Sequence, residues 1–341
     1  MTLQAHDSVI RTGAALGAIA PRRQIAVAGN DRASYLQGLL TNDIQALTAG
    51  TGCYAAWLTP QGRMLTDMHV LESGTMILLD VPAEATDSIV ARLDQFIFTE
   101  DVQVESLAES LSGVWLHGPL AAAVIEHAIG VSAGEGGRAT IAGWANYQLA
   151  PFECDGHPIT VVRIDQIGVP GYCVYIERAH EPSLLTRLEK AGAVVVLPAA
   201  LEAARIEAGY PLFGIDMTDD TIPLEAGIED RAISMSKGCY VGQEIIVRVL
   251  HRGHGRVARK LVGLRIDGTH EDAAPLRGAR LHAGDRDVGG ITSAAISPRL
   301  GVIALGYVHR DFAAAGARVE VDTPAGRAAA LVTERLIPSA P

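Results

Sequence analysis

The sequence predicts an α+β protein whose last third forms a small antiparallel β-barrel. Between residues 25 and 208, strand-like segments are interleaved with amphipathic helical segments, without the strict alternation that indicates a parallel sheet. From about Lys260 onward, six short strand-like segments alternate with glycine-rich breaks, a spacing typical of a small barrel. We therefore expect two interleaved α+β subdomains in residues 1–255 and a barrel domain in residues 256–341.

The composition is that of an ordered globular protein. Hydrophobic residues make up 48% of the 341 residues and charged residues 20%, which allows a sizeable core. The formal net charge of −11 disfavours a nucleic-acid-binding protein, since such proteins usually present a basic surface. A local basic patch for an anionic ligand stays possible. We expect no nucleic-acid partner.

The cysteines and the apolar runs indicate a cytoplasmic protein. None of the cysteines forms a C-x-x-C pair, which fits neither a zinc ribbon nor a disulfide scaffold, so we expect no metal site. Residues 1–17 lack a signal-peptide layout, because acidic, His and Arg side chains interrupt the apolar ones. The apolar runs at residues 120–129 and 191–204 are too short or too interrupted by charge to span a bilayer. The four cysteines are Cys53, Cys154, Cys173 and Cys239.

Hydrophobic periodicity places the elements of the first part. A strand at residues 25–27 precedes a helix that begins at Arg32, with Asp31 as its predicted N-cap. Residues 59–62 form a turn between strands at 53–58 and 63–71, which predicts a hairpin. Further strands are expected at residues 76–79, 102–104, 113–116, 159–164 and 172–176. Further helices are expected at residues 84–98, 119–129, 182–191 and 199–208.

The barrel strands follow a basic, glycine-rich connector at residues 251–256. Each predicted strand is a short run of β-branched and other apolar residues between turn residues. They are residues 261–266, 280–282, 287–293, 302–308, 318–321 and 328–332.

Residues 237–244, Lys-Gly-Cys-Tyr-Val-Gly-Gln-Glu, form the most unusual segment of the chain. Gly238 and Gly242 permit positive φ angles, so we expect Cys239 on a tight, exposed turn. Lys237 would favour the thiolate form of the cysteine, the form that acts as a nucleophile or metal ligand. The alternative is a small buried hydrophobe in an ordinary turn. The other candidate residues of this motif are Tyr240, Gln243 and Glu244.

The motif resembles the signature of the YgfZ family of folate-binding proteins, relatives of the glycine-cleavage T-protein (GcvT). The resemblance implies a tetrahydrofolate-binding protein that supports assembly or repair of iron–sulfur enzymes, with Cys239 as its key thiol. Its partners would be iron–sulfur carrier or client proteins, which could share a cluster with it transiently. The fold implied is a cloverleaf of subdomains around a central folate channel, closed by the barrel.

The predicted hairpin carries two further candidates. On pattern alone, two placements of Asp67 are open. It lies on the solvated face of its strand, or it is held among the apolar residues for a functional reason. By resemblance to the T-protein, Tyr54 and Asp67 match a folate-contacting tyrosine and the catalytic aspartate, while Thr66 replaces a second aspartate. The resemblance implies that Asp67 orients the pterin ring, which needs an anionic acceptor in a largely apolar pocket.

Three more residues come from segments that match the T-protein pattern. Tyr172 stands where we align the pterin-binding glutamate of the enzyme; a phenol can stack on a pterin but offers no bidentate acceptor. Arg205 is expected on the inner face of its helix, paired with a ligand carboxylate or Asp67, the alternative being a surface ion pair. Glu225 is a weaker candidate for closing the site.

Three functions follow. The first is a non-enzymatic, folate-binding maturation factor that acts through Cys239. The second is the tetrahydrofolate-dependent aminomethyltransferase of the glycine cleavage system, which Asp67, Tyr54 and Arg205 favour and Tyr172 disfavours. The third is a module that senses folate. The motif favours the first, so we expect a protein that is not a classical enzyme.

Overall fold

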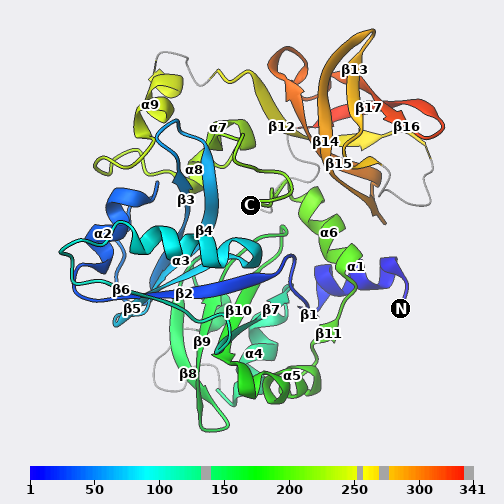
Figure 1. Ribbon diagram of the computed structural model, residues 1–341. Coiled ribbons are helices and arrows are strands. Elements are labelled where there is room, and N and C mark those ends of the chain that lie inside the picture. The colour runs from blue at the N-terminus through cyan, green and yellow to red at the C-terminus, as the bar shows by residue number, and fades with distance from the viewer. Residues whose placement is uncertain (132–139, 252–255, 269–275, 334–341) are drawn as a thin grey trace.

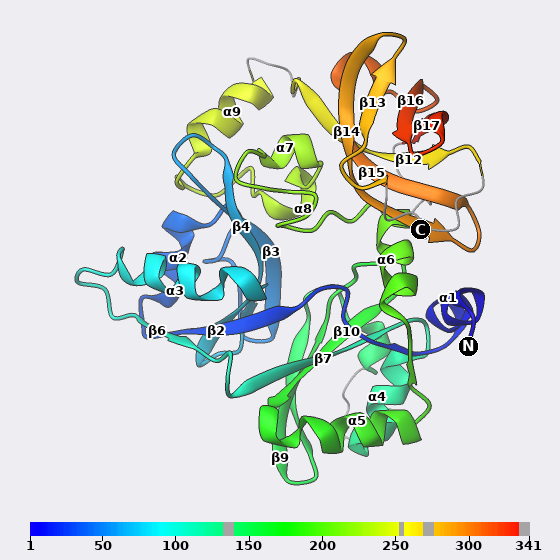
Figure 2. The same ribbon diagram turned by 45° about the vertical axis from the view of Figure 1, so that its right-hand side comes forward.

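Two β-sheets and a closed barrel form the framework of the molecule (Figure 1). The computed structural model describes residues 1–131, 140–251, 256–268 and 276–333. The chain builds the two sheets first and the barrel last, with α6 (Pro198–Glu207) between them in both views (Figure 2). The expected α+β framework with a C-terminal antiparallel barrel is confirmed.

The first sheet is a five-stranded antiparallel sheet with two chemically different faces. Successive side chains of a strand point to opposite faces, so a period of two separates them. One face is apolar and packs on α2 (Arg32–Leu39) and α3 (Thr86–Asp94). The other face carries polar side chains and is turned toward the second sheet. In spatial order the strands are β3 (Thr51–Leu58), β4 (Met64–Glu72), β5 (Met76–Pro82), β2 (Arg22–Ala28) and β6 (Gln103–Ser106).

The second sheet has six strands and packs on the polar face of the first. On its outer side, α4 (Ala121–Ile129) and α5 (Glu181–Lys190) cover an apolar core. Its inner side brings Trp115, Cys173 and Tyr175 against Leu71 and Leu78 of the first sheet. In spatial order the strands are β11 (Val194–Val195), β1 (Ala15–Leu16), β7 (Leu111–His117), β10 (Gly171–Glu177), β9 (His157–Arg163) and β8 (Leu149–Cys154).

All six predicted barrel strands form, and the barrel closes with antiparallel pairs throughout. Ala203 and Ile206 of α6 pack against Ile303 and Leu305 on the barrel wall, which ties the barrel to the rest of the chain. In spatial order the strands are β12 (Arg259–Ile266), β15 (Gly301–His309), β14 (Arg286–Ser297), β13 (Arg280–Ala283), β16 (Arg318–Thr323) and β17 (Gly326–Thr333). Residues 252–255 of the predicted connector lie outside the described residues.

Several local expectations were wrong. The predicted helix over residues 84–98 ends at Asp94, and Phe96 and Phe98 beyond it are exposed. Asp31 makes no side-chain cap on α2, because its carboxylate instead accepts a hydrogen bond from the Asp101 backbone. The helices that the sequence analysis missed are α1 (Leu3–Thr12), α7 (Pro223–Ala226), α8 (Glu229–Ala232) and α9 (Gln243–His251). In the part of the chain that is described, every helix is too short or too polar to cross a bilayer.

Candidate functional site

A polar cluster lies between the two sheets, on the inner face of the first. The register places Tyr54 opposite His69, and His69 opposite Asp80, on neighbouring strands β3, β4 and β5. Asp67 shares their face because it lies two residues before His69 on β4. Each of these four side chains is at most 3% exposed. Strand pairing thus gathers four polar groups into the interior, where each needs a partner.

Asp67 is only partly satisfied. The Tyr54 hydroxyl donates a hydrogen bond of 2.7 Å to Oδ2 of Asp67. Burial, followed by the charge of Asp67, raises the pKa of Tyr54 well above 10, which keeps the phenol protonated as the donor. Oδ1 has no hydrogen-bond partner among the described residues and lies 3.7 Å from Nη1 of Arg22. A buried carboxylate oxygen without a donor is unfavourable, so Oδ1 is suited to accept an N–H group from a ligand.

Asp80, by contrast, is fully paired. Its carboxylate accepts hydrogen bonds from Nε of Arg22, from the Tyr175 hydroxyl at 2.6 Å and from Nε2 of Gln24 at 3.3 Å. These contacts join both sheets, since Tyr175 lies on β10. Asp80 therefore holds Arg22 in place, and Arg22 in turn faces Asp67.

His69 was not identified from the sequence, although its place two residues after Asp67 could have shown it. Nδ1 of His69 lies 3.1 Å from the Tyr147 hydroxyl, and Nε2 lies 3.2 Å from the amide nitrogen of Gln166. Burial lowers the pKa of His69 well below 6.5, and the positive charges of Arg22 and Arg231 lower it further. The imidazole is therefore neutral at physiological pH.

A cavity of about 1110 Å³ meets this cluster through Gln166 and Arg231, which line it, whereas Tyr54, Asp67, His69 and Asp80 are not among its lining residues. Arg231, one of its lining residues, stacks its guanidinium 5.0 Å from the Tyr54 ring centroid and 3.9 Å from that of Tyr210. Arg231 therefore connects the cavity to the tyrosine that holds Asp67. The charged side chains of the lining are Arg11, Arg163, Asp165, Glu207, Glu225, Glu229, Asp230, Arg231 and Lys260.

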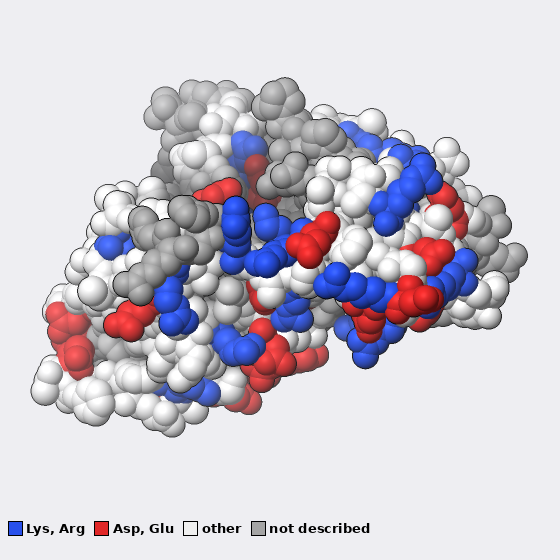
Figure 3. Space-filling model, turned by 90° about the horizontal axis from the view of Figure 1, so that it is seen from above, with Lys and Arg blue, Asp and Glu red and all other residues white. Residues whose placement is uncertain are grey.

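Charge is mixed on the face of the molecule seen from above Figure 1. Lys and Arg side chains gather near the middle of that face, with Asp and Glu among them (Figure 3). Within the described ranges, no group of three or more His, Cys, Asp or Glu side chains is arranged to hold a metal ion.

The motif at residues 237–244 presents Cys239 to solvent, while Tyr240 is buried. The ammonium of Lys237 donates to the backbone carbonyls of Gln37, Leu40 and Asn42 at 2.6, 2.5 and 3.0 Å. Lysine in this position completes the C-terminal end of α2. Burial lowers the pKa of Lys237 to about 8, against the charges of Asp43 and Cys53. The hydrogen bonds of this ammonium go to these carbonyls, and activation of the Cys239 thiol by Lys237 stays a prediction.

The turn itself depends on one of its two glycines. Gly242 has a φ of +86° and lies against β3, where a Cβ would come 2.5 Å from the Thr59 carbonyl oxygen. Gly238 is not in the left-handed region and has no neighbour within 4 Å of a built Cβ. Gln243 and Glu244 begin α9.

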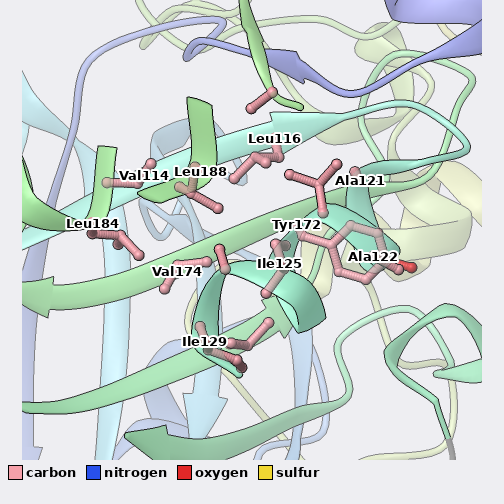
Figure 4. Close-up of a cluster of buried hydrophobic side chains, with 14 of the residues drawn as sticks. Val114, Leu116, Ala121, Ala122, Ile125, Ile129, Tyr172, Val174, Leu184 and Leu188 are labelled. Carbon is pink, nitrogen blue, oxygen red and sulfur yellow. The ribbon is translucent and has the colours of Figure 1, made fainter. Parts of the chain in front are cut away.

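Tyr172 does not reach the cluster. Its side chain is 1% exposed and lies in the apolar core under α4, among Ala121, Ala122 and Ile125 (Figure 4). Its hydroxyl is 3.4 Å from the Ile141 carbonyl oxygen. The alternation of β10 explains the correction, because residues 172 and 174 point to α4 whereas 173 and 175 point to the first sheet.

Arg205 and Glu225 are the remaining site residues that the sequence predicted. Arg205 is buried on α6, where it pairs with Asp216 at 2.7 Å and with Glu202 at 2.6 Å, and donates to Ser293 of the barrel at 2.8 Å. Arg205 therefore has a structural role, with ion pairs to Glu202 and Asp216 and a hydrogen bond that ties α6 to the barrel, and the expected pairing with Asp67 is corrected. Glu225 lines the cavity and pairs with Arg259 at 3.3 Å.

The fold and this site define a two-sheet protein with a buried carboxylate between the sheets, a cavity near that cluster, and an appended barrel. The family of the GCVT N-terminal domain matches residues 2–237, and the family of the glycine cleavage T-protein C-terminal barrel domain matches residues 259–337. The chain belongs to this T-protein (GcvT) family, which confirms the resemblance to the T-protein.

Curated relatives and a solved structure agree with this assignment. An aminomethyltransferase of Rubrobacter xylanophilus is 29% identical over 90% of this chain and 79% of its own length. An aminomethyltransferase of Bacillus subtilis is 26% identical over 94% of this chain and 86% of its own. The glycine cleavage system aminomethyltransferase T of Bartonella henselae superposes with a TM-score of 0.84 at 24% identity, over 99% of this chain and 90% of that one. The T-protein-like fold is thereby confirmed.

Proposed function

We propose that this protein binds tetrahydrofolate beside Asp67 and transfers a one-carbon unit to it, as an aminomethyltransferase. The buried carboxylate of Asp67 is the observation that carries the proposal: Tyr54 binds one oxygen, and the other has no hydrogen-bond partner among the described residues. The names of the relatives support the same reaction and disfavour the expectation of a non-enzymatic protein.

The residues present fit a folate. A reduced pterin carries several N–H donors, which match Oδ1 of Asp67, an oxygen without a hydrogen-bond donor among the described residues. The cavity of about 1110 Å³ has room for a ligand of this size. On its lining, Lys260 offers positive charge to the carboxylates of a glutamate tail, while Arg11 and Arg163 are already paired with Glu207 at 2.7 Å and Asp165 at 2.9 Å.

Tetrahydrofolate, when bound, supplies the nitrogen atoms that accept the one-carbon unit. The protein's own part is to orient them. Asp67 holds an anionic acceptor toward a ligand N–H, and Tyr54 fixes its carboxylate by the 2.7 Å hydrogen bond. Arg22, at 3.7 Å from Oδ1, places positive charge next to the carboxylate. Burial of these groups limits their contact with water and strengthens each of these interactions.

The test is anaerobic turnover of an aminomethyl-loaded lipoyl carrier with tetrahydrofolate, following release of ammonia and formation of methylene-tetrahydrofolate. Asp67→Asn keeps the volume and an acceptor oxygen but removes the charge. We expect it to lower turnover at least ~100-fold. Tyr54→Phe, which frees Oδ2, should lower it less. Wild-type rates in Asp67→Asn would refute the proposal, as would folate binding by the wild type without any turnover.

A second candidate function rests on Cys239. Its thiol is exposed, whereas Cys154 and Cys173 are buried, and Met235 and Val247 near the motif expose 63% and 40% of their surfaces. We propose on this basis a role in maintaining iron–sulfur enzymes through contact with a carrier or client protein. Cys239→Ala and Asp67→Asn, compared in a complemented strain by the activity of iron–sulfur enzymes, separate the two functions. Unchanged activity with Cys239→Ala would rule out the second.

A further inference from the structure

Tyr147 has a backbone conformation that its sequence does not explain. Its φ is +67°, and Asp155 at +53° is the other non-glycine residue with a positive φ in the described ranges. Asp155 precedes Gly156 in the hairpin turn between β8 and β9, where an Asp-Gly pair adopts this conformation readily. Tyr147 has no such reason. Bulky residues persist in the left-handed region only where their surroundings enforce it, and they gather at functional sites.

The surroundings of Tyr147 do enforce it. Its N–H donates to the Arg163 carbonyl at 2.7 Å, and Nη1 of Arg163 donates back to the Trp144 carbonyl at 2.5 Å. The side chain of Asn146 accepts from the Asp165 N–H at 3.0 Å. The turn that carries Tyr147 is thus fastened to the end of β9 at three points, and the result is a hydroxyl held 3.1 Å from Nδ1 of His69.

His69 and Gln166 set the direction of that hydrogen bond. The amide nitrogen of Gln166 can only donate, so Nε2 of His69, at 3.2 Å, accepts. In a neutral imidazole the proton then lies on Nδ1, which donates to the Tyr147 oxygen. The lowered pKa of His69 is consistent with this neutral ring.

Tyr147 consequently keeps its own proton available. No acceptor for that proton is found in hydrogen-bonding distance among the residues that the structure describes. The side chain is half-buried, and burial raises the pKa of Tyr147 well above 10, so the phenol stays protonated. Tyr210, Arg231 and Gln166 line the cavity, whereas Tyr147 itself is not among its lining residues. The ring of His69 lies 5.6 Å from that of Tyr54, which binds Asp67, and 5.7 Å from that of Tyr147.

We propose that Tyr147 donates a hydrogen bond to the ring carbonyl of the bound pterin, and that His69 and Gln166 position it as a donor. The inference rests on the proposed folate binding. The division of roles is complementary: Asp67 offers an acceptor to the N–H groups of the ligand, and Tyr147 offers a donor to its 4-oxo group. The pair selects an oxo-pterin against a ring with an amine at the same position.

The experiment compares two ligands and two proteins. Dissociation constants are measured anaerobically for tetrahydrofolate and for its 4-amino-4-deoxy analogue, with the wild type and Tyr147→Phe. The substitution retains the ring and the backbone conformation and removes only the hydroxyl. We expect tetrahydrofolate to bind about tenfold more weakly to Tyr147→Phe, and the amino analogue to change by less than about twofold. An equal loss for both ligands, or a loss for neither, would overturn the inference.

A second measurement remains decisive if the variant does not fold. Nitrogen-15 NMR of the wild type, with its histidines labelled, reports which ring nitrogen of His69 carries the proton, the signal being assigned by its loss in His69→Gln. Protonation at Nδ1 is expected, and protonation at Nε2 would overturn the inference. If the wild type binds neither ligand, the folate proposal itself fails, a result distinct from any difference between the two proteins.

Discussion

Replacing Gly242 by alanine tests whether a close backbone contact holds the turn that presents Cys239. Gly242 has a φ of +86°, a conformation that costs an L-residue about 1 kcal/mol. A Cβ would also lie 2.5 Å from the Thr59 carbonyl oxygen and 3.1 Å from the Leu58 Cβ, so the backbone of β3 or of the turn must move. Overpacking of this kind costs about 1–3 kcal/mol. Together we expect a loss of about 2–4 kcal/mol in unfolding free energy.

Gly238→Ala is the matched control in the same motif. Among the described residues, no atom lies within 4 Å of a Cβ built on Gly238, so we expect a change below about 0.5 kcal/mol. The assay is urea denaturation followed by circular dichroism, with amide hydrogen exchange of residues 237–251 as a local readout, since a chain of several domains need not unfold in one step. Equal midpoints for the two variants would refute the reasoning, as would a wild-type exchange rate in Gly242→Ala.

Two further predictions concern the interior. Burial lowers the pKa of His117 to about 4 from an ordinary 6.5, so below pH 6.5 the unfolded chain binds a proton that the folded chain does not. Stability should therefore fall as the pH drops from 6.5 to 4, with up to about 3 kcal/mol from this residue. As the pH falls across this range, urea midpoints should fall less steeply for His117→Phe than for the wild type. Parallel curves would contradict the assignment of this pH dependence to His117. Asp80→Asn should cost about 3–5 kcal/mol, because it removes the carboxylate that binds Arg22 directly and leaves Asp67, at 3.7 Å, as the remaining counter-charge. Tyr175→Phe removes one hydrogen bond from the same carboxylate and should cost about 1–3 kcal/mol; thermal denaturation should rank the two in this order, and equal losses would be inconsistent with a buried ion pair.

The sequence predicts best the elements whose signal is local. The six barrel strands were found because short apolar runs and turn glycines mark each one. β8 was missed because Pro151 argues against a strand, and it is tolerated at this edge of the sheet. α9 was missed because its β-branched residues favour a strand by propensity. Burial of Ile246 against the cluster that contains Tyr240 and Leu224 decides for the helix.

The candidate site, too, could be predicted only where its residues are close in sequence. Tyr54 and Asp67 lie on one predicted hairpin, so local pattern and family resemblance were enough to bring them together. Tyr147 reaches His69 across 78 positions of sequence, and its positive φ leaves no mark in the residue types. The prediction for Tyr172 was wrong for a simpler reason: a shift of one residue along β10 moves a side chain from the face that meets the first sheet to the face under α4.

The two candidate functions are physically linked through Asn42. Its carbonyl accepts a hydrogen bond from Lys237 at 3.0 Å, and its side-chain amide donates to the Tyr54 carbonyl at 2.8 Å and the Arg231 carbonyl at 3.1 Å. A change that removes Lys237 would thus release Asn42 and disturb the tyrosine that holds Asp67. Loss of folate turnover on deletion of the whole motif would then say nothing about the thiol. Cys239→Ala leaves these hydrogen bonds intact, and is therefore the substitution that can assign a function to the cysteine alone.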